Sequence, residues 1–209
     1  MTSTSFSLQT SANAPWLFNS SASSEIEAYT HAWSVRSHEP LPRILHQTWR
    51  SCALPSVQAR LRARCVRLLG GSSIGAGSWQ LPFWTDSDND AFVREAFPSF
   101  YPTYRKYSLP IKRADAVRYL YLWKFGGVYM DVDSSCLRHL DALELAPAEA
   151  VFSYQHGAKK APDAVANAFM AAPAGHPFLA FLLSRLEAAA AKPVQVRSQC
   201  VQVSVSQAG

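Results

Sequence analysis

The clearest pattern of apolar and polar positions lies in residues 109–136, which read LPIKRADAVRYLYLWKFGGVYMDVDSSC. Pro110 suits a first helical turn, and apolar residues then cover most of the helix circumference up to Phe125. Gly126 and Gly127 provide a helix end, because glycine readily adopts left-handed backbone angles. Residues 128–130 follow as an apolar, β-prone run. The pattern predicts a buried helix, a sharp stop and a short strand.

Strand-like and helical stretches alternate through the rest of the chain. Ile44 and Leu45 read as a buried strand that opens the domain, and a second strand is expected at residues 79–86. The helix after it is expected to begin near Asp86 or Asp88, either of which can cap it. The remaining expectations are helices at 55–69, 91–97 and 177–191, a short helical turn at 140–145 and a strand at 151–154.

Length and composition bound the organisation of the chain. A chain of 209 residues with 48% hydrophobic residues can form one domain with a proper core. Residues 1–39 are rich in serine, threonine and alanine and are expected to be a disordered or loosely packed segment. We expect the folded domain at residues 40–192, with a glycine-rich linker at 70–78, and an atypical tail at 193–209.

Charge and cysteine content exclude several classes of protein. The formal charge is +5 and the basic residues are spread out, which argues against a nucleic-acid binder. The four cysteines show no C-x-x-C spacing, so a zinc site is not expected, and one or two disulfides could form without an assignable pairing. No apolar run is long enough for a membrane span, and the N-terminus lacks signal-peptide features, although membrane association remains open.

The candidate chemistry lies where the short strand ends. Asp131 and Asp133 are two apart, so in an extended chain both side chains would point the same way. Neighbouring carboxylates repel each other unless a cation lies between them. Mg²⁺ and Mn²⁺ accept such oxygen ligands together with phosphates. Asp115 and Arg118 are three apart and share a helix face. The residues therefore predict a metal–diphosphate site beside a helical Asp/Arg pair.

A second group of candidates follows the opening strand. His46, Gln47 and Trp49 come at its carboxyl end, where open α/β sheets bind ligands. Two interpretations of His46 stay open: a contact to a nucleotide base, or a structural histidine in the core. Trp49 could likewise be core, whereas Gln47 favours the site.

These motifs together resemble glycosyltransferase family 32, whose members have a D-x-D sugar-binding region and include Och1-like mannosyltransferases and mannosyl phosphorylinositol ceramide synthases. The resemblance rests on I-x-H-Q-T-W at 44–49, on R-A-D-x-x-R-Y at 113–119, and on G-G-V-Y-x-D-x-D at 126–133. It also includes N-x-F-x-x-A-x-P at 167–173, where Asn167 is either a donor-sugar contact or a turn cap.

The resemblance implies a GT-A type nucleotide-diphospho-sugar transferase fold with a mostly parallel, Rossmann-like sheet. It implies a retaining hexosyltransferase that moves mannose or galactose from GDP-mannose or a UDP-hexose, with Mn²⁺ or Mg²⁺, to a glycan or an inositol-phosphoceramide-like acceptor. It also implies the Golgi or secretory lumen.

Roles for single residues follow from the same resemblance. Asp115, Arg118 and Asp133 are the expected catalytic residues, and Asp131 and Asp133 the expected metal ligands. The nucleotide-sugar would be bound by Gln47, Trp49, Arg113, Asp115, Arg118 and Asp131. Residues after 192 depart from the family pattern, which suggests a truncated C-terminus. The alternative function is an inactive relative that binds a nucleotide-sugar or a protein partner.

Overall fold

The computed structural model describes residues 41–70, 78–143, 149–156 and 163–191. The predictions for residues 1–39, for most of the glycine-rich linker and for the tail at 193–209 lie outside these residues. The elements in chain order are β1 (Leu45–Thr48), α2 (Ser56–Leu69), β2 (Phe83–Trp84), α3 (Asp86–Ala96), α4 (Tyr101–Lys106), α5 (Pro110–Phe125), β3 (Gly127–Met130), the 3₁₀ turn η1 (Leu140–Ala142), β4 (Val151–His156), β5 (Asp163–Ala172) and α6 (Pro177–Ala191).

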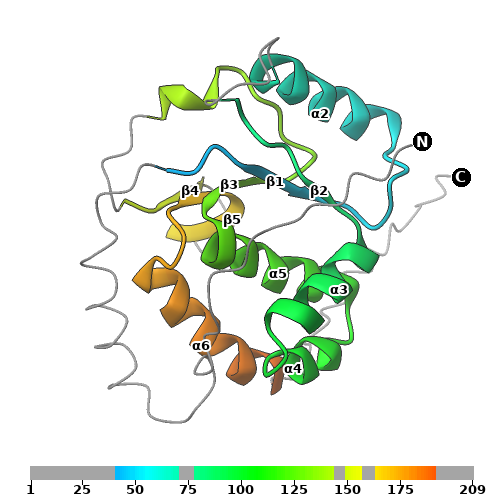
Figure 1. The fold of residues 1–209 in the computed structure, drawn as a ribbon, viewed down its shortest axis with the longest axis vertical. Helices are drawn as coiled ribbons and strands as arrows, with labels where there is room; N and C mark the ends of the chain where they lie inside the picture. The colour runs from blue at the N-terminus through cyan, green and yellow to red at the C-terminus, as the bar shows by residue number, and fades with distance from the viewer. Residues whose placement is uncertain (1–40, 71–77, 144–148, 157–162, 192–209) are drawn as a thin grey trace, which may run out of the picture.

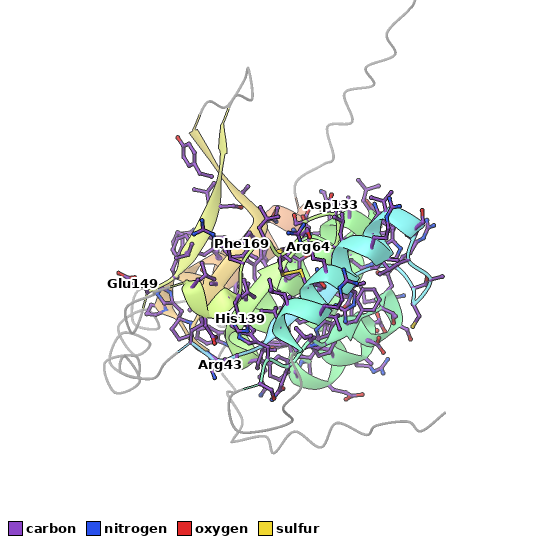
Figure 2. The ribbon with its side chains drawn as sticks, turned by 90° about the horizontal axis from the view of Figure 1, so that it is seen from above. Arg43, Arg64, Asp133, His139, Glu149 and Phe169 are labelled. Carbon is purple, nitrogen blue, oxygen red and sulfur yellow. A yellow bond between two sulfur atoms is a disulfide. The ribbon has the colours of Figure 1, made fainter. Side chains whose placement is uncertain are left out.

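The strands of the described residues form one sheet in the order β2-β1-β3-β5-β4. The pairs β1–β2 and β1–β3 are parallel, whereas β5 is antiparallel to both β3 and β4. Four of the five strands therefore run in one direction and only β5 opposes them. The predicted α/β fold with a mostly parallel sheet is confirmed. In Figure 2 the β4–β5 pair extends beyond the helices at one side of the molecule.

The sheet lies between two layers of helical structure (Figure 1), with α2 and the segment after β3 on one face and α3 to α6 on the other. Successive strand residues point to opposite faces. Leu45 and Val128 accordingly pack with Cys65 of α2, while Tyr129 joins the core beneath α5. The central strands β1 and β3 are buried along their full length. Polar side chains in them therefore need internal partners.

The predicted helix, stop and strand of residues 109–136 are all present. Gly126 ends α5 with φ of +67°, and Gly127 has φ of +94°. A Cβ on Gly127 would lie 2.5 Å from the carbonyl oxygen of Ile44, so the chain can pass between α5 and β1 only without a side chain there. Within the described residues, no helix, α5 included, combines the length and apolar character that crossing a membrane requires.

Two local expectations differ from the structure. The strand expected at residues 79–86 is reduced to Phe83–Trp84 plus an isolated bridge at Gln80, because proline at position 82 has no N–H to donate. Asp86 does not cap the next helix; it is the first helical residue. Thr85 is the N-cap, and Asp88 completes a capping box by accepting from the Thr85 N–H at 2.8 Å.

His46 is a structural residue of the core. Its ring is 1% exposed and stacks on Tyr121 at a centroid distance of 5.3 Å. Nε2 donates to the Gly126 carbonyl at 3.0 Å, and Nδ1 accepts from the Trp84 indole N–H at 3.3 Å. Because the indole can only donate, this pair of bonds fixes the neutral Nε2–H tautomer. Of the two interpretations left open for His46, the structural one is correct, and the base contact is not.

Burial of His46 makes stability depend on pH. Burial lowers the pKa of this imidazole to about 4 from an ordinary value of 6.5. As the pH falls from 6.5 towards 4, His46 therefore binds a proton in the unfolded chain but stays neutral in the folded chain. We expect the free energy of unfolding to fall by about 2 kcal/mol from this residue between pH 7 and pH 5. Urea titrations of the wild type and of His46→Leu test this: the variant is less stable at pH 7 but has the flatter pH profile. Equal pH profiles for both proteins would contradict it.

A disulfide joins the two segments that cover one face of the sheet. Cys65 of α2 is bonded to Cys136, 71 residues further along the chain, and Figure 2 draws the bond in yellow. The Cys136 N–H also donates to the Cys65 sulfur at 3.0 Å. The bond fixes α2 to the segment that leaves the D-x-D motif, three residues after Asp133. Cys52 is free and exposed, and Cys200 lies outside the described residues.

We expect the Cys65→Ser/Cys136→Ser double variant to lose about 4 kcal/mol of unfolding free energy, because a loop of this length is no longer closed in the unfolded chain. Urea unfolding under oxidising conditions measures the loss. Cys52→Ser is the matched control and should unfold like the wild type. The assignment of the disulfide fails if adding a reductant leaves the wild-type unfolding midpoint unchanged.

Candidate functional site

The site lies where the parallel strands β1 and β3 end side by side. Leu45 is level with Val128 and His46 with Tyr129, so the residues that follow each strand leave the same edge of the sheet. The Trp49 N–H donates to the Trp84 carbonyl at 3.0 Å, and the Asp131 N–H donates to the Ala168 carbonyl at 2.8 Å. Both residues are thus held by ladder-type hydrogen bonds one step beyond their strands.

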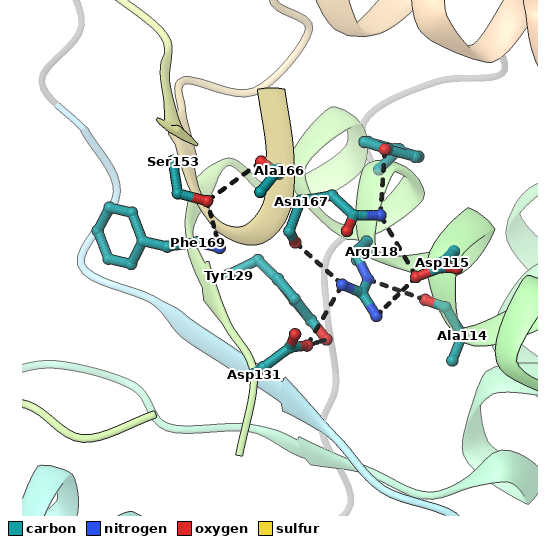
Figure 3. Close-up of polar contacts among 10 residues, drawn as sticks. Ala114, Asp115, Arg118, Tyr129, Asp131, Ser153, Ala166, Asn167 and Phe169 are labelled. Atoms are coloured by element: carbon teal, nitrogen blue, oxygen red, sulfur yellow. Dashed lines mark hydrogen bonds and ion pairs between the residues drawn. The ribbon is translucent and has the colours of Figure 1, made fainter. Parts of the chain in front are cut away.

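Arg118 of α5 is the centre of the polar network at this edge (Figure 3). Its side chain is 5% exposed, and its guanidinium stacks over the Tyr129 ring at 4.6 Å. NH1 donates to the Asn167 carbonyl at 3.0 Å and pairs with Asp131 Oδ1 at 3.3 Å. NH2 pairs with Asp115 Oδ1 at 3.0 Å, and Nε donates to the carbonyl one helical turn earlier. This single cation therefore connects α5, β3 and β5.

Asp131 is held from two sides. The Tyr129 hydroxyl donates to its Oδ1 at 2.6 Å, because residues two apart on β3 share a face. Burial raises the pKa of the Asp131 carboxyl, while the Tyr129 hydrogen bond and the Arg118 charge lower it. The nearby Asp133 carboxylate adds to the upward shift. Among the described residues, Oδ1 takes all the hydrogen bonds and Oδ2 is left open.

Asp115 and Asn167 form the more open side of the same cluster. The Asp115 side chain is 43% exposed, so one part contacts Arg118 and another faces solvent. The Asn167 amide donates to Asp115 Oδ1 and to the Tyr119 hydroxyl, both at 3.3 Å. Asn167 lies within β5, so its interpretation as a turn cap is wrong, and its side chain belongs to the predicted cluster.

Asp133 does not share the extended geometry expected of the D-x-D pair. The strand ends at Met130, and residues 132–133 form a turn closed by the Ser134 N–H donating to the Asp131 carbonyl at 3.0 Å. Asp133 is exposed, and no other described residue forms a hydrogen bond or ion pair with its carboxylate. The two aspartates thus differ: Asp131 is part of the protein framework, and Asp133 is available to a ligand.

The remaining predicted site residues occupy different positions. Gln47 is buried at the end of β1, and Trp49 follows it. Arg113, expected to bind the nucleotide-sugar, lies outside the cluster around Arg118 and donates to the Tyr107 carbonyl at 2.6 Å. The reason is geometric, because residues two apart on a helix lie on nearly opposite sides, so Arg113 and Asp115 cannot face the same partners.

Unpartnered polar atoms mark the same edge of the sheet. Within the described residues, the buried side-chain nitrogen and oxygen atoms without a hydrogen-bond partner are Gln47 Nε2, Trp49 Nε1 and Ser135 Oγ. Native interiors leave few such atoms, and each calls for a ligand, a water or another explanation. Gln47 lies in the last half of β1, and Trp49 and Ser135 come after β1 and β3, so all three are near the carboxyl ends of these strands, where an open α/β sheet binds its ligand.

A divalent cation fits the D-x-D residues. Asp131 Oδ2 and the exposed Asp133 carboxylate are hard oxygen donors, and the Coulomb repulsion between the two carboxylates would be relieved by a cation. Two protein carboxylates are what Mg²⁺ typically uses when substrate phosphates supply further oxygens. Within the described residues, no cluster of three or more His, Cys, Asp or Glu side chains could hold a metal without such help.

The fold is similar to that of a solved glycosyltransferase. The described structure is similar to that of PaToxG Glycosyltransferase, with a TM-score of 0.53 and 15% sequence identity over 79% of this chain and 68% of that chain. At that identity the similarity concerns the fold.

Sequence comparison identifies relatives of this chain. Residues 65–151 match the family described as "Glycosyltransferase sugar-binding region containing DXD motif". The chain is 33% identical to mannosyl phosphorylinositol ceramide synthase CSH1 of Saccharomyces cerevisiae over 147 residues, 70% of this chain and 35% of the relative. It is 31% identical to inositol phosphoceramide mannosyltransferase 3 of Schizosaccharomyces pombe over 153 residues, 73% of this chain and 39% of the relative.

Residues 65–151 therefore match the DXD sugar-binding region of these glycosyltransferases, and 70–73% of the chain aligns with the two relatives. The chain spans little more than a third of the length of these curated relatives.

Three contributors to the site were not predicted. Tyr129 could have been found, because its i, i+2 spacing to Asp131 places both on one strand face. Arg62, which contacts Gln47, is one of several arginines on α2, and nothing in the sequence distinguishes it from the others. Ser135 carried no signal in the sequence, because only the fold shows that its hydroxyl is enclosed.

Arg118 and Asp133 should differ sharply in their effect on stability. We expect Arg118→Met to lower the free energy of unfolding by about 2–3 kcal/mol, because it leaves the partly buried Asp131 without its cation and the Asn167 carbonyl without its donor. Asp133→Asn should change it by less than about 0.5 kcal/mol, since the carboxylate is exposed and free of protein contacts. Urea unfolding without added metal measures both. A fully stable Arg118→Met variant would show that the cluster is not part of the framework.

Proposed function

We propose that this chain is the catalytic region of a metal-dependent, retaining hexosyltransferase that uses a nucleotide-diphosphate sugar. The observation that carries the proposal is the difference between the two aspartates of the D-x-D motif. Arg118 and Tyr129 hold Asp131 rigidly, and Asp133 is left exposed beside it. A rigid carboxylate next to a free one suits a site that binds its cation together with a diphosphate.

The names of the relatives support mannose as the sugar and inositol phosphoceramide as the acceptor. Both follow from similarity and are proposals for this chain, with galactose as the alternative sugar. GDP-mannose is the matching donor, and a UDP-hexose is the alternative.

The residues of the cluster take distinct parts in this scheme. Most of the Arg118 N–H groups already have protein partners, so its main part is to fix the positions of Asp115 and Asp131. Asp115 and Asn167 form the exposed side, and their oxygens and N–H groups suit the hydroxyls of the donor sugar. When bound, the divalent cation would neutralise negative charge on the departing diphosphate.

The proposed reaction keeps the configuration at the anomeric carbon. The acceptor hydroxyl oxygen forms a bond to that carbon on the face from which the diphosphate leaves, and the bond between the carbon and the phosphate oxygen breaks. The hydroxyl proton passes to the departing phosphate oxygen. The chain's part is to orient the sugar through Asp115 and Asn167 so that the two oxygens meet at one face.

We further propose that the chain works in the secretory lumen. The Cys65–Cys136 disulfide supports this location, because structural disulfides persist in oxidising compartments and are rare in the cytosol. The Golgi would provide both this redox state and a membrane-bound lipid acceptor.

Transfer of mannose from GDP-mannose to inositol phosphoceramide tests the function, with UDP-galactose run in parallel. We expect product with Mn²⁺, none in excess EDTA, and at least about a hundredfold lower turnover for Asp133→Asn, because the free metal ligand is lost. Glu95→Gln is the matched control, since Glu95 is an exposed acid on α3 with a side chain 76% exposed.

Full activity of Asp133→Asn, or undiminished activity in EDTA, would exclude the metal-dependent scheme. Binding of GDP-mannose without either transfer or hydrolysis would instead identify an inactive relative that retains the donor site.

A further inference from the structure

Arg62 of α2 is a half-buried arginine that points at the end of β1 rather than into solvent. Its NH1 donates to Gln47 Oε1 at 2.7 Å, and its NH2 donates to the Leu81 carbonyl at 3.0 Å. The guanidinium also stacks on the Phe83 ring at 4.6 Å. Within the described residues it has no ion pair with a carboxylate, so these contacts alone fix its orientation.

The contact with Arg62 decides which way the Gln47 amide faces. A guanidinium carries only donors, so the atom of Gln47 that it contacts must be the carbonyl oxygen. The amide nitrogen is then forced to the opposite side. Gln47 is completely buried, and this Nε2 is one of the unpartnered buried atoms at the edge of the sheet. The two N–H groups of Nε2 therefore have no acceptor among the described residues and are available to a ligand.

The unpartnered atoms at this position are all hydrogen-bond donors. Gln47 Oε1 is occupied by Arg62, and the nearby unpartnered Trp49 Nε1 is likewise a donor. A ligand group placed here must therefore accept hydrogen bonds. A ligand that offers an N–H instead would leave two donors facing each other without water, which binding sites reject strongly.

We propose that Arg62 is a positioning residue for base selection: it fixes the Gln47 amide so that Nε2 donates to a carbonyl oxygen of the donor nucleotide's base. The inference rests on the proposed function and narrows it. The accepting atom is O4 of uracil or O6 of guanine, because cytosine and adenine carry an amino group at these same ring positions. The site thus accepts UDP- or GDP-sugars and rejects their CDP and ADP counterparts.

The test is equilibrium binding of UDP, CDP, GDP and ADP to the full chain with Mn²⁺, measured by calorimetry. Each carbonyl base is compared with the amino base of the same ring size. For the preferred ring size, we expect the wild type to bind the carbonyl base at least about tenfold more tightly, as one buried hydrogen bond made or lost implies. Arg62→Met retains packing on Phe83 but frees the amide to turn over, so the ratio should fall to about threefold or less.

Three further variants separate positioning from mere stability. Arg62→Lys retains a donor for Gln47 Oε1 and should restore most of the discrimination. Gln47→Glu retains the contact with Arg62 but replaces the Nε2 donor with an acceptor, so it should lower or reverse the preference. Arg60→Met makes the same change at an exposed arginine of α2 and should leave the ratio unchanged.

The outcomes distinguish this inference from the function beneath it. If Arg62→Met lowers stability or overall affinity but leaves the ratio between carbonyl and amino bases unchanged, Arg62 is a packing residue and the inference is wrong, while the glycosyltransferase proposal stands. A wild type that binds UDP and CDP equally, and GDP and ADP equally, also overturns it. If none of the four nucleotides binds, both proposals fail.

Discussion

The site depends on the burial of one charged group, the guanidinium of Arg118. Burying a cation is unfavourable unless acceptors and opposite charge surround it, and Arg118 obtains these from three separate elements. The helix supplies Asp115 and its own carbonyl, β3 supplies Asp131, and β5 supplies a backbone oxygen. The register of β5 on β3 and the rotation of α5 above them must therefore agree before the charge is satisfied. The same residues form the candidate site, so folding and function share one requirement.

The parallel pairing of β1 and β3 gives the site its second half. Because both strands end at one edge of the sheet, the residues after β1 come close to the D-x-D turn although more than 80 residues separate them in sequence. The disulfide then fixes α2 over this edge. One side of the site is consequently acidic and suited to a metal ion, and the other presents amide and indole hydrogen-bond donors. A nucleotide-sugar, with diphosphate in the middle and a base at one end, matches this order of chemistry.

The sequence predicted the elements well where local signals agree. The α5–Gly126–Gly127–β3 series combined a helix-compatible proline, a buried apolar circumference and a double glycine, and each acts in the structure as expected. The cluster of Asp115, Arg118 and Asp131 could be predicted, because a spacing of three on a helix and a position at the end of a strand are both visible in the local sequence. The sequence could not show that the chain turns immediately after Met130, which leaves Asp133 exposed while Asp131 is held by protein contacts.

Contacts between distant elements were the part that sequence could not provide. Arg62 and Gln47 are 15 residues apart and meet only because α2 folds back over β1. The choice between a core and a ligand-binding role for His46 depended on Gly126 and Trp84 lying on either side of its ring. The prediction for Arg113 failed for a different reason. All residues of the motif at 113–119 were expected at the site, although the rotation of the helix places them on two faces.

The covalent link between Cys65 and Cys136 has a mechanical consequence. Backbone and disulfide together form a closed ring that contains β2, α3, α4, α5 and β3, and hence Asp115, Arg118 and Asp131. Tension applied to the two chain ends would bypass this ring through the sulfur atoms. Strand β5, which carries Asn167, lies outside the ring together with β1, β4 and α6, so it would bear the load. The ion pairs of Arg118 with Asp115 and Asp131 lie within the ring and would be shielded, so under force the sugar-facing side of the site would open before its charged centre.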